Sequence, residues 1–232
     1  MPKTTFITGA NKGLGFETAR RLTALGHTVL LGARDTDRGR RAAAEIGARF
    51  VRIDVTDDAS VAAAAADTAA HEGRIDVLIN NAGITGSLVT AEELTGAQAA
   101  LVLDTNAAGV VRVTTAFLPL LRASAAPAVV NVTSGLGSVT LTHDPERVES
   151  TVIAPAYAAS KAAVTMLTTQ YAKAFADIRF NAVDPGHTAT DLNGHTGTQT
   201  VTEGTDAIVT LATEDPDAGT GRIIDRYGPL TW

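Results

Sequence analysis

Short apolar runs and alanine-rich stretches alternate along the whole chain. Runs rich in β-branched residues predict strands at 4–8, 27–33, 49–55, 75–81, 128–134, 178–184 and 221–225. The alanine-rich stretches between them predict helices near 14–25, 36–46, 57–72, 91–122, 155–175 and 202–213. Because the strand runs show little alternation of apolar and polar residues, they are typical of parallel strands that are covered on both faces.

This order of elements predicts an α/β fold. We expect a single doubly wound Rossmann-type domain, residues 1–232, with a parallel sheet of about seven strands and helices on both faces. The segment 57–72 is so rich in alanine that it resembles a low-complexity tract. Its length, the aspartates at its start and Gly73 at its end favour a crossover helix.

Composition and charge exclude several classes of protein. With 45% hydrophobic and 19% charged residues, the chain has the composition of an ordinary globular protein. Its net charge of −6, without a basic run, argues against nucleic acid or an anionic membrane surface as partner. The chain has no cysteine, and neither a membrane-spanning run nor a signal-peptide pattern is evident. We therefore expect a cytoplasmic protein.

The first strand is followed by a glycine-rich turn, TGANKGLG (8–15), and then by a helix. Free backbone N–H groups at the start of a helix bind phosphate, and glycine lets a pyrophosphate come close. The spacing Gly-x-x-x-Gly-x-Gly differs from the commoner dinucleotide-binding pattern. By itself, the turn is also compatible with a tight connection that binds nothing.

Five more motifs follow in order: NNAG (80–83), NAAG (106–109), NVTS (131–134), YAASK (157–161) and DPGHTATD (184–191). Together with the glycine turn they resemble the short-chain dehydrogenase/reductase family along nearly the whole chain. Within that family, the glycine turn and the segment GARDTDRG (32–39) are similar to the carbonyl-reductase-like branch.

Tyr157 and Lys161 are four residues apart, so both side chains lie on one face of the predicted helix. An ammonium near the phenol would favour the phenolate and lower the pKa of Tyr157. The resemblance implies that Tyr157 is the acid/base, that Ser134 stabilises the same substrate oxygen, and that Asn106 positions a water which links Lys161 to solvent. A surface Tyr–Lys contact and a turn serine are the alternatives.

The resemblance also implies a nicotinamide cofactor held along the carboxyl ends of the strands. Asp54 and Val55 would meet the adenine, and the segment after Asp184 would hold the nicotinamide. Asn81 would either flank the cofactor or tie neighbouring strands together. The expected cofactor-binding residues are Gly9, Asn11, Lys12, Gly13, Leu14, Gly15, Arg34, Asp54, Val55, Asn81, Ala82, Gly83, Tyr157, Lys161, Pro185, Gly186, Thr188 and Thr190.

Two basic residues indicate which cofactor is preferred. Lys12 and Arg34 stand where, in the resemblance, basic residues bind the 2′-phosphate, and guanidinium pairs well with phosphate. Asp35 instead lies near the position of an acid that holds the ribose of NAD. Because the strand ends at Ala33, we expect Asp35 to cap the next helix and NADP(H) to be preferred over NAD(H). A solvated surface charge is the alternative for Lys12.

The glycine- and threonine-rich segment 187–200 is interpreted as a mobile flap over the substrate. His187 and His195 lie in it, but their spacing matches no helical pair of metal ligands, so no metal site is expected.

Residues 139–155 form an expected insertion near the active-site mouth, because Ser134 and Tyr157 are farther apart than the roughly one dozen positions usual in the family. The insertion would influence substrate choice. In carbonyl-reductase relatives a longer insertion accompanies a monomeric state, so monomer and homodimer both stay open.

The sequence thus predicts an NADPH-dependent oxidoreductase that interconverts a small-molecule ketone or aldehyde and an alcohol by hydride transfer. One alternative is a family member with epimerase or dehydratase activity. Another is a non-catalytic NADP-sensing regulatory protein, against which the complete set of Asn106, Ser134, Tyr157 and Lys161 argues. The particular substrate and the direction of the reaction are not encoded in any motif.

Overall fold

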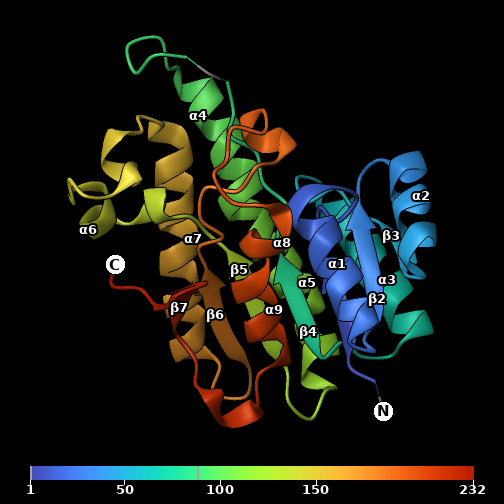
Figure 1. Ribbon diagram of the computed structural model, residues 1–232. Coiled ribbons are helices and arrows are strands. Elements are labelled where there is room, and N and C mark those ends of the chain that lie inside the picture. Colours follow the sequence, from blue (N-terminus) through green and yellow to red (C-terminus); the bar gives the residue numbers. More distant parts are fainter. Residues whose placement is uncertain (1, 88) are drawn as a thin grey trace.

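Among the residues that the structure describes, eight strands form one sheet in the order β3-β2-β1-β4-β5-β6-β7-β8 (Figure 1). The computed structural model describes residues 2–87 and 89–232. The strands are β1 (Thr4–Ile7), β2 (Thr28–Ala33), β3 (Arg49–Arg52), β4 (Val77–Asn80), β5 (Ala128–Val132), β6 (Arg179–Val183), β7 (Ile223–Asp225) and β8 (Gly228–Pro229). The first seven run parallel, which confirms the predicted Rossmann-type sheet, and β8 pairs antiparallel with β7.

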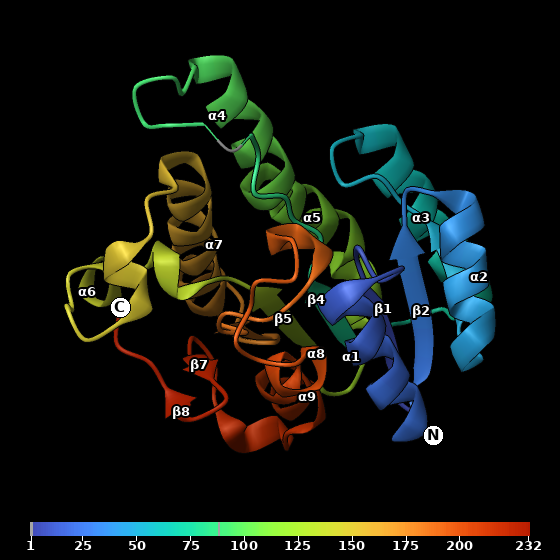
Figure 2. The ribbon, with the colours of Figure 1, turned by 45° about the horizontal axis from the view of Figure 1, so that its top comes forward.

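Helices cover both faces of the sheet (Figure 2). They are α1 (Gly13–Ala24), α2 (Thr36–Ile46), α3 (Asp58–His71), α4 (Gly96–Leu103), α5 (Gly109–Arg122), α6 (Val139–Thr142), α7 (Pro155–Ala174), α8 (Val201–Gly204) and α9 (Asp206–Thr213). The core on one face is built from α1, α2 and α9, and the core on the other from α3, α5 and α7. The predicted doubly wound arrangement is therefore present.

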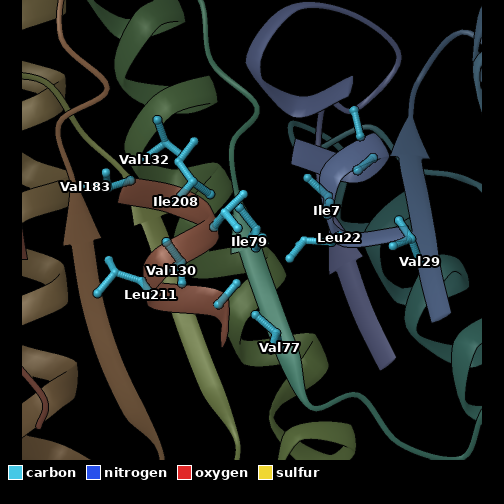
Figure 3. Close-up of a cluster of buried hydrophobic side chains, with 14 of the residues drawn as sticks. Ile7, Leu22, Val29, Val77, Ile79, Val130, Val132, Val183, Ile208 and Leu211 are labelled. Atoms are coloured by element: carbon cyan, nitrogen blue, oxygen red, sulfur yellow. The ribbon is translucent and has the colours of Figure 1, made fainter. Parts of the chain in front are cut away.

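Adjacent residues of one strand enter opposite cores. Phe6 of β1 packs against Phe117 of α5, with 4.5 Å between the ring centroids. Its neighbour Ile7 faces the other core with Leu22 of α1 (Figure 3). Both are fully buried, which explains why the strand runs are apolar at every position.

Two aspartates begin helices as the sequence predicts. The Asp35 carboxylate accepts a hydrogen bond from the backbone N–H of Arg38 at 2.9 Å and caps α2. Asp57 accepts from the N–H groups of Ala59 and Ser60 and caps α3. The alanine-rich segment is thus a crossover helix.

The predicted helix 91–122 differs from the structure at its start and in its middle. It begins at Gly96 behind a capping box of Thr95 and Gln98, and a π-helical turn, Asp104–Ala108, separates α4 from α5. By length and composition Gly96–Arg122 could cross a membrane. It packs against α3 and α7 instead, and a helix that covers a sheet has the same composition, so this is weak evidence for a membrane span.

The predicted insertion 139–155 contains α6 and a short 3₁₀ turn, Val148–Thr151. It lies beside α7, in yellow in Figure 1. Because β4, β5 and β6 are parallel, their carboxyl ends share one edge of the sheet. The motifs that follow these strands are therefore brought together there.

Candidate active site

The glycine turn lies at the carboxyl end of β1 and packs against the end of β4. Gly9 and Gly13 have φ angles of +64° and +55°, which favour glycine. A Cβ on Gly9 would also lie 2.9 Å from the Cα of Ala82. Lys12, the residue before α1, makes no side-chain cap. The first N–H groups of α1 are therefore not taken up by a capping side chain.

This edge of the sheet fits a dinucleotide. The uncapped start of α1 can donate to a diphosphate, and the bare turn lets it approach. Beside it, Thr8, Val55 and Ala82 lie close together. Val55 and Ala82 are two of the residues expected at the cofactor, and the structure places both next to the glycine turn.

Asn81 ties two strand ends together. Its side-chain amide donates to the backbone carbonyls of Thr8 at 2.9 Å and of Gly9 at 3.1 Å. Because both bonds reach the glycine turn, the structural one of the two predicted roles is present. Gly15 lies against the same asparagine, and a Cβ there would clash with it.

Arg34 and Asp35, the charged residues that follow β2, have different surroundings. Arg34 is exposed, and within the described part of the chain no ion pair or hydrogen bond of its side chain is found. The Asp35 carboxylate is engaged by the cap of α2 and by Arg38, whose Nε lies 3.2 Å away. The acid that could hold a ribose is therefore occupied, whereas the guanidinium of Arg34 is available.

Lys12 forms an ion pair with the predicted flap, and its role toward the 2′-phosphate stays a prediction. Its Nζ lies 2.9 Å from Oδ2 of Asp191, in the segment 187–200. Both side chains are more than half exposed, so the pair is weak. It joins the glycine turn to the predicted flap.

Tyr157, Lys161 and Ser134 meet at the carboxyl end of β5. Tyr157 and Lys161 lie in the first turns of α7, and the Lys161 Nζ is 5.6 Å from the centroid of the Tyr157 ring. The Ser134 hydroxyl forms a hydrogen bond with the Tyr157 phenol. Lys161 is buried and donates to the carbonyl of Val132 at 2.9 Å. The structure thus brings three of the four predicted catalytic residues into one cluster.

The predicted direction of the Tyr157 pKa is not what the protein atoms produce. Burial raises the pKa of Tyr157 to about 12, the Asp184 carboxylate acts in the same direction, and the hydrogen bond with Ser134 opposes them. Lys161 does not lower it, because its amine is already uncharged at the pH where the phenol titrates. Burial lowers the pKa of Lys161 itself to about 8.

Asn106, the fourth predicted catalytic residue, lies in the π-helical turn and is buried. Its Oδ1 accepts a hydrogen bond from the Ile84 N–H, and its Nδ2 donates to the Ile84 carbonyl, each at 2.8 Å. The Nδ2 also donates to the Ser160 hydroxyl at 2.9 Å. Ser160 in turn donates to the Tyr157 carbonyl at 2.7 Å. Asn106 therefore braces the start of α7, and its role toward a water stays a prediction. π turns are frequent at functional sites.

Gly83 shows how closely the end of β4, the π-helical turn and α7 approach each other. A Cβ there would lie 3.3 Å from the Asn106 Oδ1 and 3.6 Å from the Lys161 Nζ. The end of β4, the π turn and α7 therefore converge on one point.

The predicted flap 187–200 folds over the glycine turn. Thr188 forms a β-bridge with Gln199, and a Cβ on Gly13 would lie 3.6 Å from the Thr190 methyl carbon. Thr188 and Thr190 are buried. The mobility of the segment 187–200 stays a prediction. Among the residues that the structure describes, no group of His, Asp or Glu side chains could hold a metal ion.

The remaining expected cofactor residues lie along the same edge. Asn11 and Leu14 belong to the glycine turn and the start of α1, Asp54 follows β3, and Pro185 and Gly186 follow β6. The Asp54 carboxylate accepts from the N–H and hydroxyl of Thr56 at 3.0 and 2.7 Å, which stabilises this turn.

No motif in the sequence indicated a role for Ser160, Glu149 or Asp184. Ser160 lies inside the YAASK motif, one residue before Lys161, and that position was the available signal. Glu149 and Asp184 are far apart in the chain but approach each other at Gly135. Such proximity depends on the tertiary fold, and no local pattern indicates it.

Comparisons with known proteins cover nearly the whole chain. The family model described as short chain dehydrogenase matches residues 3–200. The short-chain dehydrogenase anuI of Penicillium roqueforti is 36% identical over 97% of this chain and 94% of its own. (+)-Neomenthol dehydrogenase of Arabidopsis thaliana is 31% identical, with 91% of each chain covered. The crystal structure of NADPH-bound carbonyl reductase from chicken fatty liver has a TM-score of 0.88 at 27% identity, and covers 100% of this chain and 99% of its own.

Proposed function

Because the chain belongs to the short-chain dehydrogenase family and is an oxidoreductase that acts on ketones or alcohols, we propose that it reduces a ketone or aldehyde with NADPH. Tyr157 is the acid that protonates the carbonyl oxygen. One observation carries this proposal: Tyr157, Ser134 and Lys161 meet at the strand edge that also bears the glycine turn.

The chain's own residues have distinct tasks in this reaction. Bound NADPH supplies the hydride; the glycine turn and the start of α1 hold its diphosphate, and Arg34 holds its 2′-phosphate. Burial keeps the Tyr157 phenol protonated at neutral pH, as an acid must be. The Ser134 hydroxyl, already bonded to that phenol, donates to the same carbonyl oxygen as its negative charge develops.

The proposed preference for NADPH is supported by the charged side chains that follow β2. Arg34 offers an exposed guanidinium, and Asp35 is occupied as a helix cap. The structurally similar carbonyl reductase from chicken is an NADPH complex. The 2′-phosphate distinguishes NADPH from NADH, so these charges bear directly on the preference.

The test is a panel of aldehydes, ketones, quinones and steroids, each followed by loss of NADPH absorbance with NADH in parallel. We expect turnover of at least one carbonyl and a higher kcat/KM with NADPH. Binding of NADPH without turnover of any carbonyl would contradict the reductase and favour a cofactor sensor. A change of substrate without consumption of NADPH would favour an epimerase or dehydratase.

The ion pair of Lys12 with Asp191 leads to a further prediction. Asp191→Asn removes the charge that competes with the cofactor's 2′-phosphate for Lys12, so NADPH should bind about threefold more tightly while NADH is unaffected. The free energy of unfolding should change by less than about 0.5 kcal/mol, because both side chains are exposed. Fluorescence titration of both cofactors measures the difference. Equal tightening of NADH would contradict it.

A further inference from the structure

Asp184 is a buried carboxylate that the proposed reaction does not use. It follows β6 directly and precedes the Pro185–Gly186 turn, and only 4% of its surface is exposed. Burying an ionisable group is costly unless it is hydrogen-bonded. Its partners therefore indicate what it does.

Both partners are backbone N–H groups at the active-site edge. The Asp184 Oδ1 accepts from Gly186 at 2.9 Å, and the carboxylate also accepts from Gly135. Gly135 directly follows Ser134. One carboxylate thus joins the end of β5, which carries Ser134, to the turn after β6, which is expected at the nicotinamide.

Gly135 has no Cβ because there is no room for one. A Cβ there would lie 2.9 Å from the Asp184 Oδ2 and would clash with the Glu149 carboxylate. Gly135 does not have a positive φ, so the approach of the two carboxylates explains the glycine. Glu149 belongs to the insertion 139–155 and is held by Arg147 through bonds of 2.9 and 3.1 Å.

Several charged and titratable groups lie near Asp184. Arg147 and Glu149 come from the insertion, Asp225 from β7, and Tyr157 and Lys161 from α7. Burial raises the pKa of Asp184, and Glu149 and Asp225 raise it further; its two backbone hydrogen bonds oppose them. In the other direction, the Asp184 charge disfavours the Tyr157 phenolate.

We propose that Asp184 is a positioning residue, whose carboxylate fixes Ser134 and the Pro185–Gly186 turn relative to each other. This inference rests on the proposed reductase function. It assigns to the residue before Pro-Gly a supporting role behind the groups that contact substrate and cofactor.

The substitution Asp184→Asn tests this positioning role, because the asparagine side chain has nearly the same size and shape as that of aspartate. The asparagine amide can accept at one end only, and its NH₂ would face a backbone N–H group that needs an acceptor. We expect kcat for carbonyl reduction to fall about 10- to 30-fold because Ser134 is misplaced, and KM for NADPH to change less. The pH profile of alcohol oxidation should shift to lower pH, because the charge that opposes the phenolate is gone.

Asp57→Asn is the matched control. Asp57 also accepts from two backbone N–H groups, those of Ala59 and Ser60 at 2.9 and 3.2 Å, but it caps α3 and is not among the charged groups near Asp184. It should leave kcat and the pH profile of Tyr157 unchanged. Gly135→Ala, which pushes the two carboxylates away from the Ser134 backbone, should lower kcat as Asp184→Asn does.

The outcomes are separable. Wild-type kcat and an unshifted pH profile in Asp184→Asn would overturn the proposal, as would equal effects of Asp57→Asn. If Asp184→Asn fails to fold by circular dichroism, the same comparison is made with Gly135→Ala, and wild-type kcat in that variant would overturn it. If the wild-type chain itself turns over no carbonyl, the proposed function has failed instead.

Discussion

Tyr157→Phe is expected to lower kcat for carbonyl reduction about 1,000-fold, the scale of a lost general acid. The substitution removes the phenol proton that the carbonyl oxygen receives, and leaves the aromatic ring beside Lys161 in place. NADPH should therefore bind with nearly unchanged affinity. Single-turnover rates together with NADPH titration separate the loss of chemistry from any loss of binding.

Tyr171→Phe is its control. Tyr171 lies on the same helix, packs against Phe180 and forms a hydrogen bond with Thr115, away from the sheet edge. Activity should stay within about twofold of wild type, because this hydroxyl touches no reacting group. A Tyr157→Phe variant that retains full activity would show that another group supplies the proton.

The pH dependence of the wild-type enzyme follows from the same residue. Reduction needs the protonated phenol, and the pKa of Tyr157 is raised to about 12. The acid form is thus present throughout the neutral range and is lost only as the pH rises toward that value. Oxidation needs the phenolate, so its rate should rise with pH across the alkaline range.

Arg34→Ala should weaken NADPH binding about 100-fold, the equivalent of roughly 3 kcal/mol for hydrogen bonds between guanidinium and a phosphate dianion. NADH lacks that phosphate, so its affinity should change little. Titrations of both cofactors measure the ratio of the two dissociation constants.

Arg20→Ala is the corresponding control, because it removes an exposed arginine of α1 that is paired with Glu17. It should affect neither cofactor. If Arg34→Ala weakens NADH and NADPH equally, Arg34 supports the fold of this region rather than binding the 2′-phosphate. High salt should also weaken NADPH binding to wild type more than NADH binding, because the exposed pairing is screened.

Much of the fold could be predicted because each parallel strand is buried on both faces. The apolar runs at 4–8 and 128–134 contain β1 and β5, and Asp35 caps α2 as expected. The two-residue strand β8 leaves no hydrophobic pattern, so it could not be found. The π-helical turn inside 91–122 has no sequence signature of its own and is set by how Asn106 packs against Ile84 and Ser160.

The site was predicted less completely. Motifs at strand ends indicated Ser134, Tyr157 and Lys161, because parallel strands collect such residues at one edge. The predicted direction of the Tyr157 pKa was wrong, since helical spacing does not reveal that the phenol and Lys161 are both buried. Asp184 was missed because its proposed role depends on its approach to Gly135, which is distant in sequence.

The two outer strands of the sheet have a consequence for solubility at high concentration. On one side β3 ends in exposed Arg52, and on the other β8 is only two residues long and includes Pro229, which has no N–H group to donate. A neighbouring molecule therefore finds no long, flat row of unpaired donors and acceptors on which to add a strand. The two edge strands, β3 and β8, therefore disfavour edge-to-edge association of sheets into open-ended fibrils.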